Sequence, residues 1–76
     1  MKNLRKEFGK RLHQLRRKNN LTQEDLSSLT DISVDFISMV ERGINAPSFE
    51  SIEKIANALK VTVKELFDFE DVGKPL

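Results

Sequence analysis

The spacing of apolar residues constrains the fold of this chain more than any other feature. In the first 18 residues they recur at intervals of three or four, which places them on one face of an α-helix. These residues are Leu4, Phe8, Leu12 and Leu15. Similar spacing recurs in four later segments, whereas the β-prone run at 61–63 is too short for a convincing strand. We therefore expect an all-α fold of five helices at about residues 3–18, 22–30, 33–42, 49–59 and 62–67.

Residues that begin and end helices separate these segments. Two pairs have the spacing of a capping box, and two serines are also of the N-cap type. They are Thr22 with Asp25, Thr62 with Glu65, Ser33 and Ser48. Asn19-Asn20 and Gly43 are suited to helix ends, because Asn and Gly tolerate a left-handed backbone. We expect the later helices to bury Leu26, Leu29, Ile37, Val40, Ile52, Ile55, Ala56, Leu59 and Leu66.

The length and composition bound the kinds of site that the chain can carry. With 76 residues we expect one domain at 1–69, followed by a flexible acidic tail at 70–76. The chain has no cysteine and one histidine, so we expect no disulfide, no metal site and no cofactor. No apolar run is long enough for a membrane span or a signal peptide, so we expect a cytoplasmic protein without membrane contact.

The charges are unevenly distributed along the chain. Residues 1–20 carry eight Lys and Arg against one acid, whereas residues 21–76 carry five against eleven acids. A basic segment of this kind predicts a face that meets phosphates, although a solvated basic helix would have the same composition. We expect no catalysis, because no acid/base pair, nucleophile set or glycine-rich phosphate loop has the required spacing.

Several short runs together resemble a known family. The predicted helices at 22–30 and 33–42 are joined by a short connection, which forces a sharp angle between them. The runs are Leu21-Thr22-Gln23-Glu24-Asp25-Leu26, Ile37-Ser38-Met39-Val40-Glu41-Arg42-Gly43, Pro47-Ser48-Phe49-Glu50-Ser51-Ile52, Ile55-Ala56-Asn57-Ala58-Leu59 and Glu65-Leu66-Phe67. In this order they resemble the lambda-repressor-like (Cro-like, xenobiotic-response-element) helix-turn-helix family over about residues 5–69.

The chain departs from the family pattern at two positions. Ser27 stands where alanine is typical, and Asp31 stands where the turn usually has glycine. Asp can adopt the left-handed conformation at modest cost, so the turn remains compatible with this sequence.

The resemblance implies a sequence-specific regulator of transcription that binds double-stranded DNA. A repressor or a restriction–modification controller would bind a palindromic operator as a homodimer, with the helix at 33–42 in the major groove. Such a protein would act in a prokaryotic cell, from a bacterial or phage gene, and without a small-molecule ligand. The alternative is a protein-interaction module, such as an antitoxin, that chiefly binds a protein partner.

The helical wheel of residues 33–42 predicts which side chains would read bases. With Ile37 and Val40 inward, the outward stripe contains Val34, Asp35, Ser38 and Met39. Asp35 can accept a hydrogen bond from the cytosine amine, and Val34 can contact a thymine methyl group. In the alternative reading these are ordinary surface residues, with Val34 and Met39 partly packed.

A second set of residues is expected at the DNA backbone. It comprises Arg17, Gln23, Phe36, Arg42, Asn45 and Ser48. The resemblance implies that Gln23 bonds a phosphate and braces the recognition helix. Phe36 can pack against the sugar-phosphate backbone or be buried in the core, and Ser48 is first of all a helix cap.

Two further pairs have expected roles in architecture and assembly. The resemblance implies an ion pair between Arg16 and Glu41 that orients the recognition helix, while His13 beside it is expected to be an exposed polar residue. Phe67 and Phe69 give the C-terminal segment more apolar bulk than it needs. They are candidates for a dimer interface, and closing the core is the alternative role.

Overall fold

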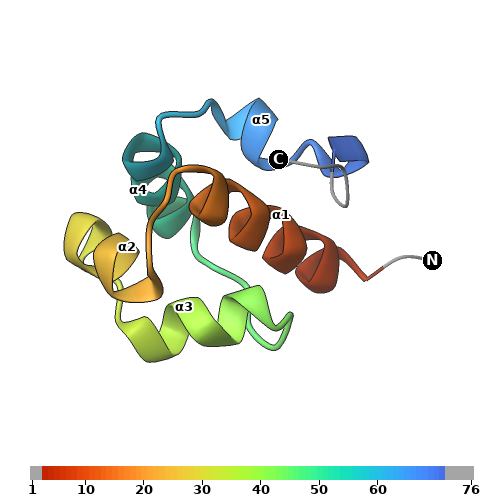
Figure 1. The fold of residues 1–76 in the computed structure, drawn as a ribbon. Helices are drawn as coiled ribbons and strands as arrows, with labels where there is room; N and C mark the ends of the chain where they lie inside the picture. The colour runs from red at the N-terminus through yellow and green to blue at the C-terminus, as the bar shows by residue number, and fades with distance from the viewer. Residues whose placement is uncertain (1–2, 72–76) are drawn as a thin grey trace.

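The computed structural model describes residues 3–71, and every regular element in this range is helical. The elements are α1 (Leu4–Lys18), α2 (Gln23–Thr30), α3 (Val34–Glu41), α4 (Phe49–Leu59), α5 (Val63–Leu66) and the 3₁₀ turn η1 (Phe69–Asp71). The predicted all-α fold with five α-helices is confirmed (Figure 1). Of the predicted tail, residues 70 and 71 belong to η1, and residues 72–76 lie outside the described range.

The two predicted capping boxes are both formed. The Thr22 hydroxyl accepts from the Asp25 amide at 3.0 Å, and the Asp25 carboxylate accepts from the Thr22 amide at 2.9 Å. Thr62 and Glu65 make the same two bonds at the start of α5. The backbone amides of Thr22 and Thr62 hold the pKa values of Asp25 and Glu65 below their ordinary values.

Left-handed residues end or follow four of the helices, and the helix-end signals in the sequence predicted two of these positions. Asn20 after α1 has φ 58°, and Gly43 after α3 has φ 78°. Asp31 has φ 61° at the end of α2, so it takes the conformation that glycine usually supplies in this turn. Lys60 has φ 58° at the end of α4, where no residue type had signalled it.

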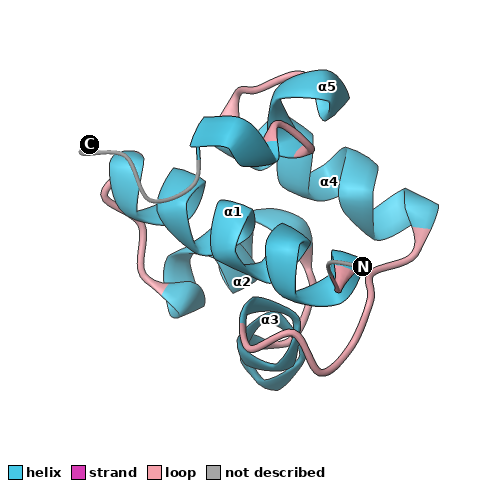
Figure 2. Cartoon of the chain, turned by 90° about the vertical axis from the view of Figure 1, so that its right-hand side faces the viewer, coloured by secondary structure: helices cyan, strands magenta, loops and turns pink. Residues whose placement is uncertain are grey.

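The helices enclose one apolar core around α1. Figure 1 shows α1 across the middle of the molecule, with α3 on one side and α4 and α5 on the other, and the turned view in Figure 2 agrees. The core consists of Phe8, Leu12, Leu15, Leu26, Ile37, Val40, Ile52, Ile55, Ala56, Leu59 and Leu66. Every apolar residue predicted to be buried in α3, α4 and α5 belongs to it.

The prediction for the buried face of α2 was wrong at one position. Leu29 is 61% exposed, while Thr30, four residues after Leu26, is only 3% exposed. The Thr30 hydroxyl donates to the Leu26 carbonyl at 2.7 Å, so this polar side chain is satisfied within the helix and can be buried. The i+4 position therefore faces the core in place of the i+3 position.

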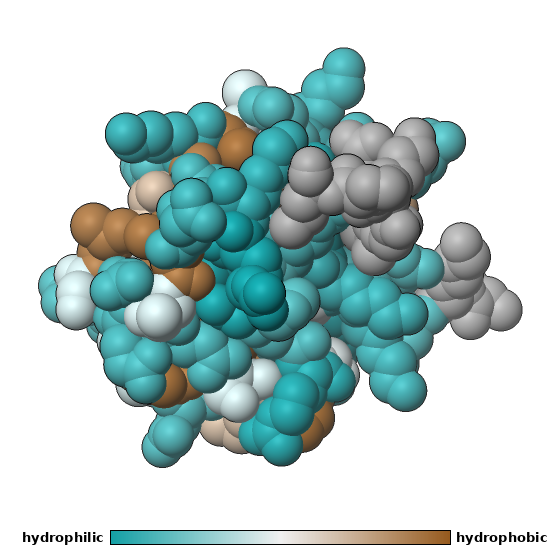
Figure 3. Space-filling model, in the orientation of Figure 1, coloured by the Kyte–Doolittle hydropathy of each residue, from teal (hydrophilic) through white to brown (hydrophobic). Residues whose placement is uncertain are grey.

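The surface is mostly polar on the face shown in Figure 3, with small hydrophobic patches between hydrophilic side chains. Among the described residues, no helix combines the length and the apolar character that a bilayer span requires.

Candidate nucleic-acid interface

A tight turn fixes the angle between α2 and α3. Its first residue, Asp31, donates its amide to the Ser27 carbonyl at 2.8 Å and turns the chain in the left-handed conformation. The Ile32 amide then donates to the Thr30 hydroxyl at 3.2 Å. The Ser33 hydroxyl accepts from the Phe36 amide at 3.1 Å and caps α3. Each backbone group of the turn named here has a partner, so α3 begins in a defined direction.

The helix α3 lies at one edge of the molecule and keeps one face free of the core. Figure 2 shows α3 nearly end-on at this edge, on the far side of α1 from α4 and α5. Ile37 and Val40 are each only 1% exposed, and they pack the inner face of α3 into the core. Of the four predicted base-reading residues, Asp35 is exposed, and Val34, Ser38 and Met39 are half-buried. They lie along one stripe, and their contact with bases stays a prediction.

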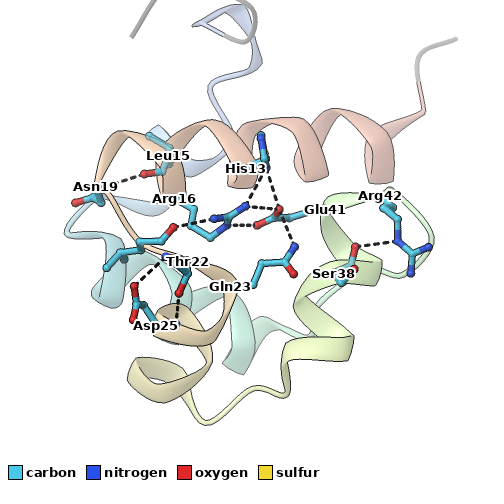
Figure 4. A network of polar contacts seen from close by, with 11 residues as sticks. His13, Leu15, Arg16, Asn19, Thr22, Gln23, Asp25, Ser38, Glu41 and Arg42 are labelled. Carbon is cyan, nitrogen blue, oxygen red and sulfur yellow. Dashed lines mark hydrogen bonds and ion pairs between the residues drawn. The ribbon is translucent and has the colours of Figure 1, made fainter.

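A buried ion pair holds the end of α3 against α1. Arg16 Nε donates to Glu41 Oε2 at 2.7 Å, and Arg16 Nη2 donates to Glu41 Oε1 at 3.1 Å (Figure 4). The exposed fractions of the two side chains are 8% and 6%. Arg16 Nη1 also donates to the Leu21 carbonyl at 2.7 Å, so the same guanidinium holds the segment before α2. One side chain thus connects α1 with both helices of the motif.

The same carboxylate also connects two neighbouring polar residues. Gln23 Nε2, on the first residue of α2, donates to Glu41 Oε1 at 3.2 Å. His13 Nδ1 lies 3.0 Å from Glu41 Oε1 and 3.1 Å from Arg16 Nη2. The His13 side chain is 50% exposed, so the expectation of an exposed polar residue omitted its place in this network. Figure 4 shows these side chains converging from α1, α2 and α3.

The environment of Glu41 favours its charged form. Burial alone would raise its pKa, but hydrogen bonds from Arg16, His13 and Gln23 and the charge of Arg16 together outweigh burial. The pKa of Glu41 therefore lies below its ordinary value of 4.5. The network is anionic at its centre and stays ionised at neutral pH.

Two arginines of the basic N-terminal segment are buried within the described part of the fold. Arg16 is 7% exposed and Arg11 is 6% exposed. Arg11 Nε donates to the Glu65 carbonyl at 2.9 Å, and its Nη1 donates to Gln14 Oε1 at 2.7 Å, which fastens α5 to α1. A count of charges along the sequence could not separate these two arginines from the solvated ones.

The predicted phosphate-binding residues fall into separate places. Arg17 and Gln23 line the same polar hollow of about 420 Å³, between the end of α1 and the start of α2, together with Asn20. Arg42 is exposed at the end of α3, and its Nε lies 3.4 Å from the Ser38 carbonyl. The hollow and Arg42 lie at opposite ends of the helix-turn-helix segment.

The remaining three residues are partly engaged within the fold. Asn45 is half-buried, with its Nδ2 3.5 Å from Met39 Sδ. The Ser48 hydroxyl accepts from the Ser51 amide at 3.1 Å and caps α4. Phe36 is half-buried against the core, which is one of the two roles expected for it. Their contact with phosphates stays a prediction.

The aromatic residues near the C-terminus have different surroundings. Phe67 is 36% exposed, and its ring lies 5.0 Å from Phe8 and 5.9 Å from Phe69. Phe69 is half-buried against the core. The most exposed large hydrophobic residue in the described range is Phe49, at 84%, followed by Leu4 and Leu29. The sequence pattern gave Phe49 no role.

The described residues contain no cluster of three or more His, Cys, Asp or Glu side chains that could hold a metal ion. The fold presents a helix-turn-helix whose second helix, α3, lies at the edge of the molecule, with the polar network of Arg16, Glu41, Gln23 and His13 behind it.

Comparison with known proteins shows which family has this arrangement. A helix-turn-helix family model matches residues 12–66. The control protein C.BamHI of Bacillus amyloliquefaciens is 42% identical over 72 residues, which cover 93% of this chain and 89% of that protein. The control protein C.MunI of a Mycoplasma species is 34% identical over 68 residues, which cover 88% of this chain and 92% of that protein.

A solved structure agrees with these relatives. The restriction–modification controller protein C.AhdI from Aeromonas hydrophila superposes with a TM-score of 0.79 and 37% identity, over 82% of this chain and 94% of that chain. The family match spans both helices of the motif and most of the domain around them. The chain therefore belongs to the Cro/C1-like helix-turn-helix family of DNA-binding transcriptional regulators.

Proposed function

We propose that this regulator binds a palindromic operator as a homodimer, with α3 of each copy in the major groove. The observation that carries the proposal is the position of α3 at an edge of the molecule, where the Arg16–Glu41 pair holds its end and Asp35 on its outer stripe is exposed. A helix fits the major groove, which is about 12 Å wide. One such helix reads only a few base pairs, so two half-sites one helical turn apart supply the needed specificity.

The regulated genes are the second part of the proposal. Two relatives are named control proteins, and a structural relative is described as a restriction–modification controller. Those proteins and this chain match over most of their lengths. We therefore infer that this chain controls genes of a restriction–modification system, acting on DNA in the cytoplasm of a prokaryote.

Within the proposed complex, reading and positioning are divided between elements. Val34, Asp35, Ser38 and Met39 lie on the stripe that would face the base edges. Arg17 and Gln23 share a hollow that would receive a phosphate at the start of α2. Because Gln23 is already bonded to Glu41, its side chain is held in place before DNA arrives.

A binding titration with a selected operator and a random duplex at several salt concentrations tests the DNA-binding function. We expect the operator to bind at least about 10³-fold more tightly, with affinity for both duplexes falling steeply as salt rises. The protein-interaction alternative predicts weak binding without sequence selection. Equal affinity for both duplexes would therefore refute the proposal.

Substitution of Asp35 tests the reading face. We expect Asp35→Ala to relax base preference at one operator position, by about 1–3 kcal/mol of discrimination. Glu53→Ala, which removes an exposed acid on α4, is the matched control and should leave the selected sequence unchanged. If a randomised-site selection returns the same sequence with Asp35→Ala as with the unaltered chain, Asp35 does not read a base.

A further inference from the structure

His13 is the side chain of the polar network whose charge can change near neutral pH. It is the only histidine in the chain, and histidine ordinarily changes its charge between about pH 5 and 8. Its Nδ1 lies 3.0 Å from Glu41 Oε1 and 3.1 Å from Arg16 Nη2 (Figure 4). The His13 side chain is 50% exposed, so protons from the solvent reach it, whereas Glu41 and Arg16 are buried.

The two neighbours of Nδ1 require opposite forms of the imidazole ring. Arg16 Nη2 is a donor, so Nδ1 can accept from it only when Nδ1 carries no proton. Glu41 Oε1 is an acceptor, so Nδ1 can donate to it only when Nδ1 carries a proton. In the charged ring both nitrogens carry protons, so Nδ1–H bonds to the carboxylate and Nε2–H is left to donate to a further acceptor.

His13 belongs to a basic row along α1. The spacing of its members by four, three and four residues places them on one helical face, and all are exposed. The members of this row are Lys6, Lys10, His13 and Arg17. Like charges four residues apart destabilise a helix, so the row is favourable chiefly where negative charge meets it. The elements α5 and η1 pack against the face of α1 that carries Phe8 and Arg11.

One end of the basic row lies beside the proposed phosphate site. Arg17 lines the polar hollow at the start of α2 together with Gln23. Gln23 Nε2 and His13 Nδ1 both contact Oε1 of Glu41, at 3.2 and 3.0 Å. A phosphate bound in this hollow would therefore lie near the His13 ring, on the side of α1 that faces the helix-turn-helix.

The charges around His13 compete over its protonation in the free domain. Three cations of α1 disfavour a charged ring: Lys10, Arg16 and Arg17. On α3, Glu41 favours a charged ring, but this carboxylate is already paired with Arg16. On α2, the exposed Glu24 lines the hollow and adds one negative charge on that side.

DNA changes this balance in one direction. Each phosphate near the ring adds negative charge, and an opposite charge within about 4–6 Å favours the charged form of a titratable group. Binding and protonation are linked equilibria, so if DNA favours the charged ring, the charged ring favours DNA by the same factor.

We propose that His13 takes up one proton from the solvent when this chain binds DNA, and that its Nε2–H then donates to a phosphate beside the hollow. His13 thereby joins Arg17 and Gln23 as a contact to the DNA backbone. The affinity for DNA then depends on pH in the range where histidine titrates. This inference rests on the proposed DNA binding by the helix-turn-helix and adds its regulation by protons.

Binding titrations at pH 6 and pH 8 test the inference at constant salt. We expect the unaltered chain to bind at least about threefold more tightly at pH 6. The gain should be the same for the operator and for a random duplex, because a phosphate contact carries no sequence information. The slope of log affinity against log salt should be steeper at pH 6 by about 0.9, the value for one added phosphate contact.

Two substitutions separate the charge of His13 from the space that it fills. His13→Gln stays neutral, so it should bind as weakly at pH 6 as at pH 8. His13→Lys is charged at both values, so it should bind at pH 8 about as tightly as the unaltered chain binds at pH 6. Lys18→Gln is the matched control, because it removes an exposed cation of α1 outside the basic row and should keep the pH dependence.

Two further measurements exclude an effect on folding alone. Circular dichroism should show the same helical content for all four proteins at both pH values. The NMR signals of the His13 ring should titrate with a midpoint at higher pH in the operator complex than in the free chain.

The possible failures are distinguishable. If the unaltered chain binds equally at both pH values, or if His13→Gln keeps the pH dependence, the inference is refuted and DNA binding through α3 stands. If His13→Lys binds as weakly as His13→Gln at pH 8, a charge at this position does not contact phosphate, and the inference is also refuted. If neither duplex is preferred at either pH, the proposed function fails, and the inference fails with it.

Discussion

Replacing Arg16 with methionine removes the positive half of the buried pair while keeping an apolar stem of similar length. The Glu41 carboxylate then stays buried at 6% exposure without its cation, and the Leu21 carbonyl loses its donor. Removing one partner of a buried pair costs about 3–5 kcal/mol. We expect about 3 kcal/mol, the lower end of that range, because Glu41 keeps its contacts with Gln23 and His13.

This loss is large for a domain of this size. Stabilities of roughly 0.05–0.15 kcal/mol per residue give about 4–11 kcal/mol for the whole chain. At roughly 4–8 °C per kcal/mol, the substitution should lower Tm by about 12–24 °C. Urea denaturation followed by circular dichroism measures the free energy of unfolding, and a thermal scan measures Tm.

The double variant Arg16→Met with Glu41→Leu is the control that isolates the cause. Replacing both members of a buried pair with apolar residues is close to neutral, so we expect stability within about 1 kcal/mol of the unaltered chain. The double variant should still bind DNA more weakly, because Gln23 loses the carboxylate that holds it. If Arg16→Met lowers the free energy of unfolding by less than about 1 kcal/mol, the pair stabilises the fold no more than an exposed salt bridge does, and the reasoning is refuted.

Three further predictions concern stability. Gly9→Ala should cost about 1–3 kcal/mol in urea denaturation, because its Cβ would overlap the Val40 carbonyl oxygen and push α1 from α3; an unchanged value would contradict this close approach. Lys60→Gly should raise the free energy of unfolding by about 1 kcal/mol by relieving a left-handed backbone, and a loss on the same assay would contradict it. Because the folded pKa of Glu41 is lowered, its stabilisation is present above the ordinary value of 4.5 and is lost as the pH falls through the folded pKa. Stability measured from neutral to acidic pH should therefore fall less for Glu41→Gln, and an equal fall would contradict this assignment.

The helices could be predicted from the sequence because their signals are local. Thr22, Ser33, Ser48 and Thr62 all cap helices as expected. The apolar spacing identified the core residues of α3, α4 and α5 and, apart from the exposed Leu4, those of α1. Leu29 was misplaced because the i+3 and i+4 positions both lie near the core face, and only the hydrogen bond of Thr30 decides between them.

The surface properties could not be predicted in the same way, because they depend on contacts between distant segments. The burial of Arg11 depends on a carbonyl 54 residues away, and the position of His13 depends on a carboxylate 28 residues away. An apolar groove of about 520 Å³ beside Phe49 exists only where α1, α4 and the end of α5 meet. The spacing of residues along one helix carries no information about tertiary contacts between distant segments.

The division of the basic residues bears on how this domain recognises DNA. Residues 1–20 carry eight cations, but Arg11 and Arg16 are buried and bonded within the fold. At most six of these eight can then meet phosphates, which limits what this segment adds to the electrostatic part of binding that is common to all sequences. The outer stripe of α3 from Val34 to Met39 contains no Arg or Lys. If α3 enters the major groove as proposed, we expect discrimination to come from apolar contacts, from the Asp35 carboxylate and from DNA shape. Each of these would depend on how firmly the Arg16–Glu41 pair orients the helix.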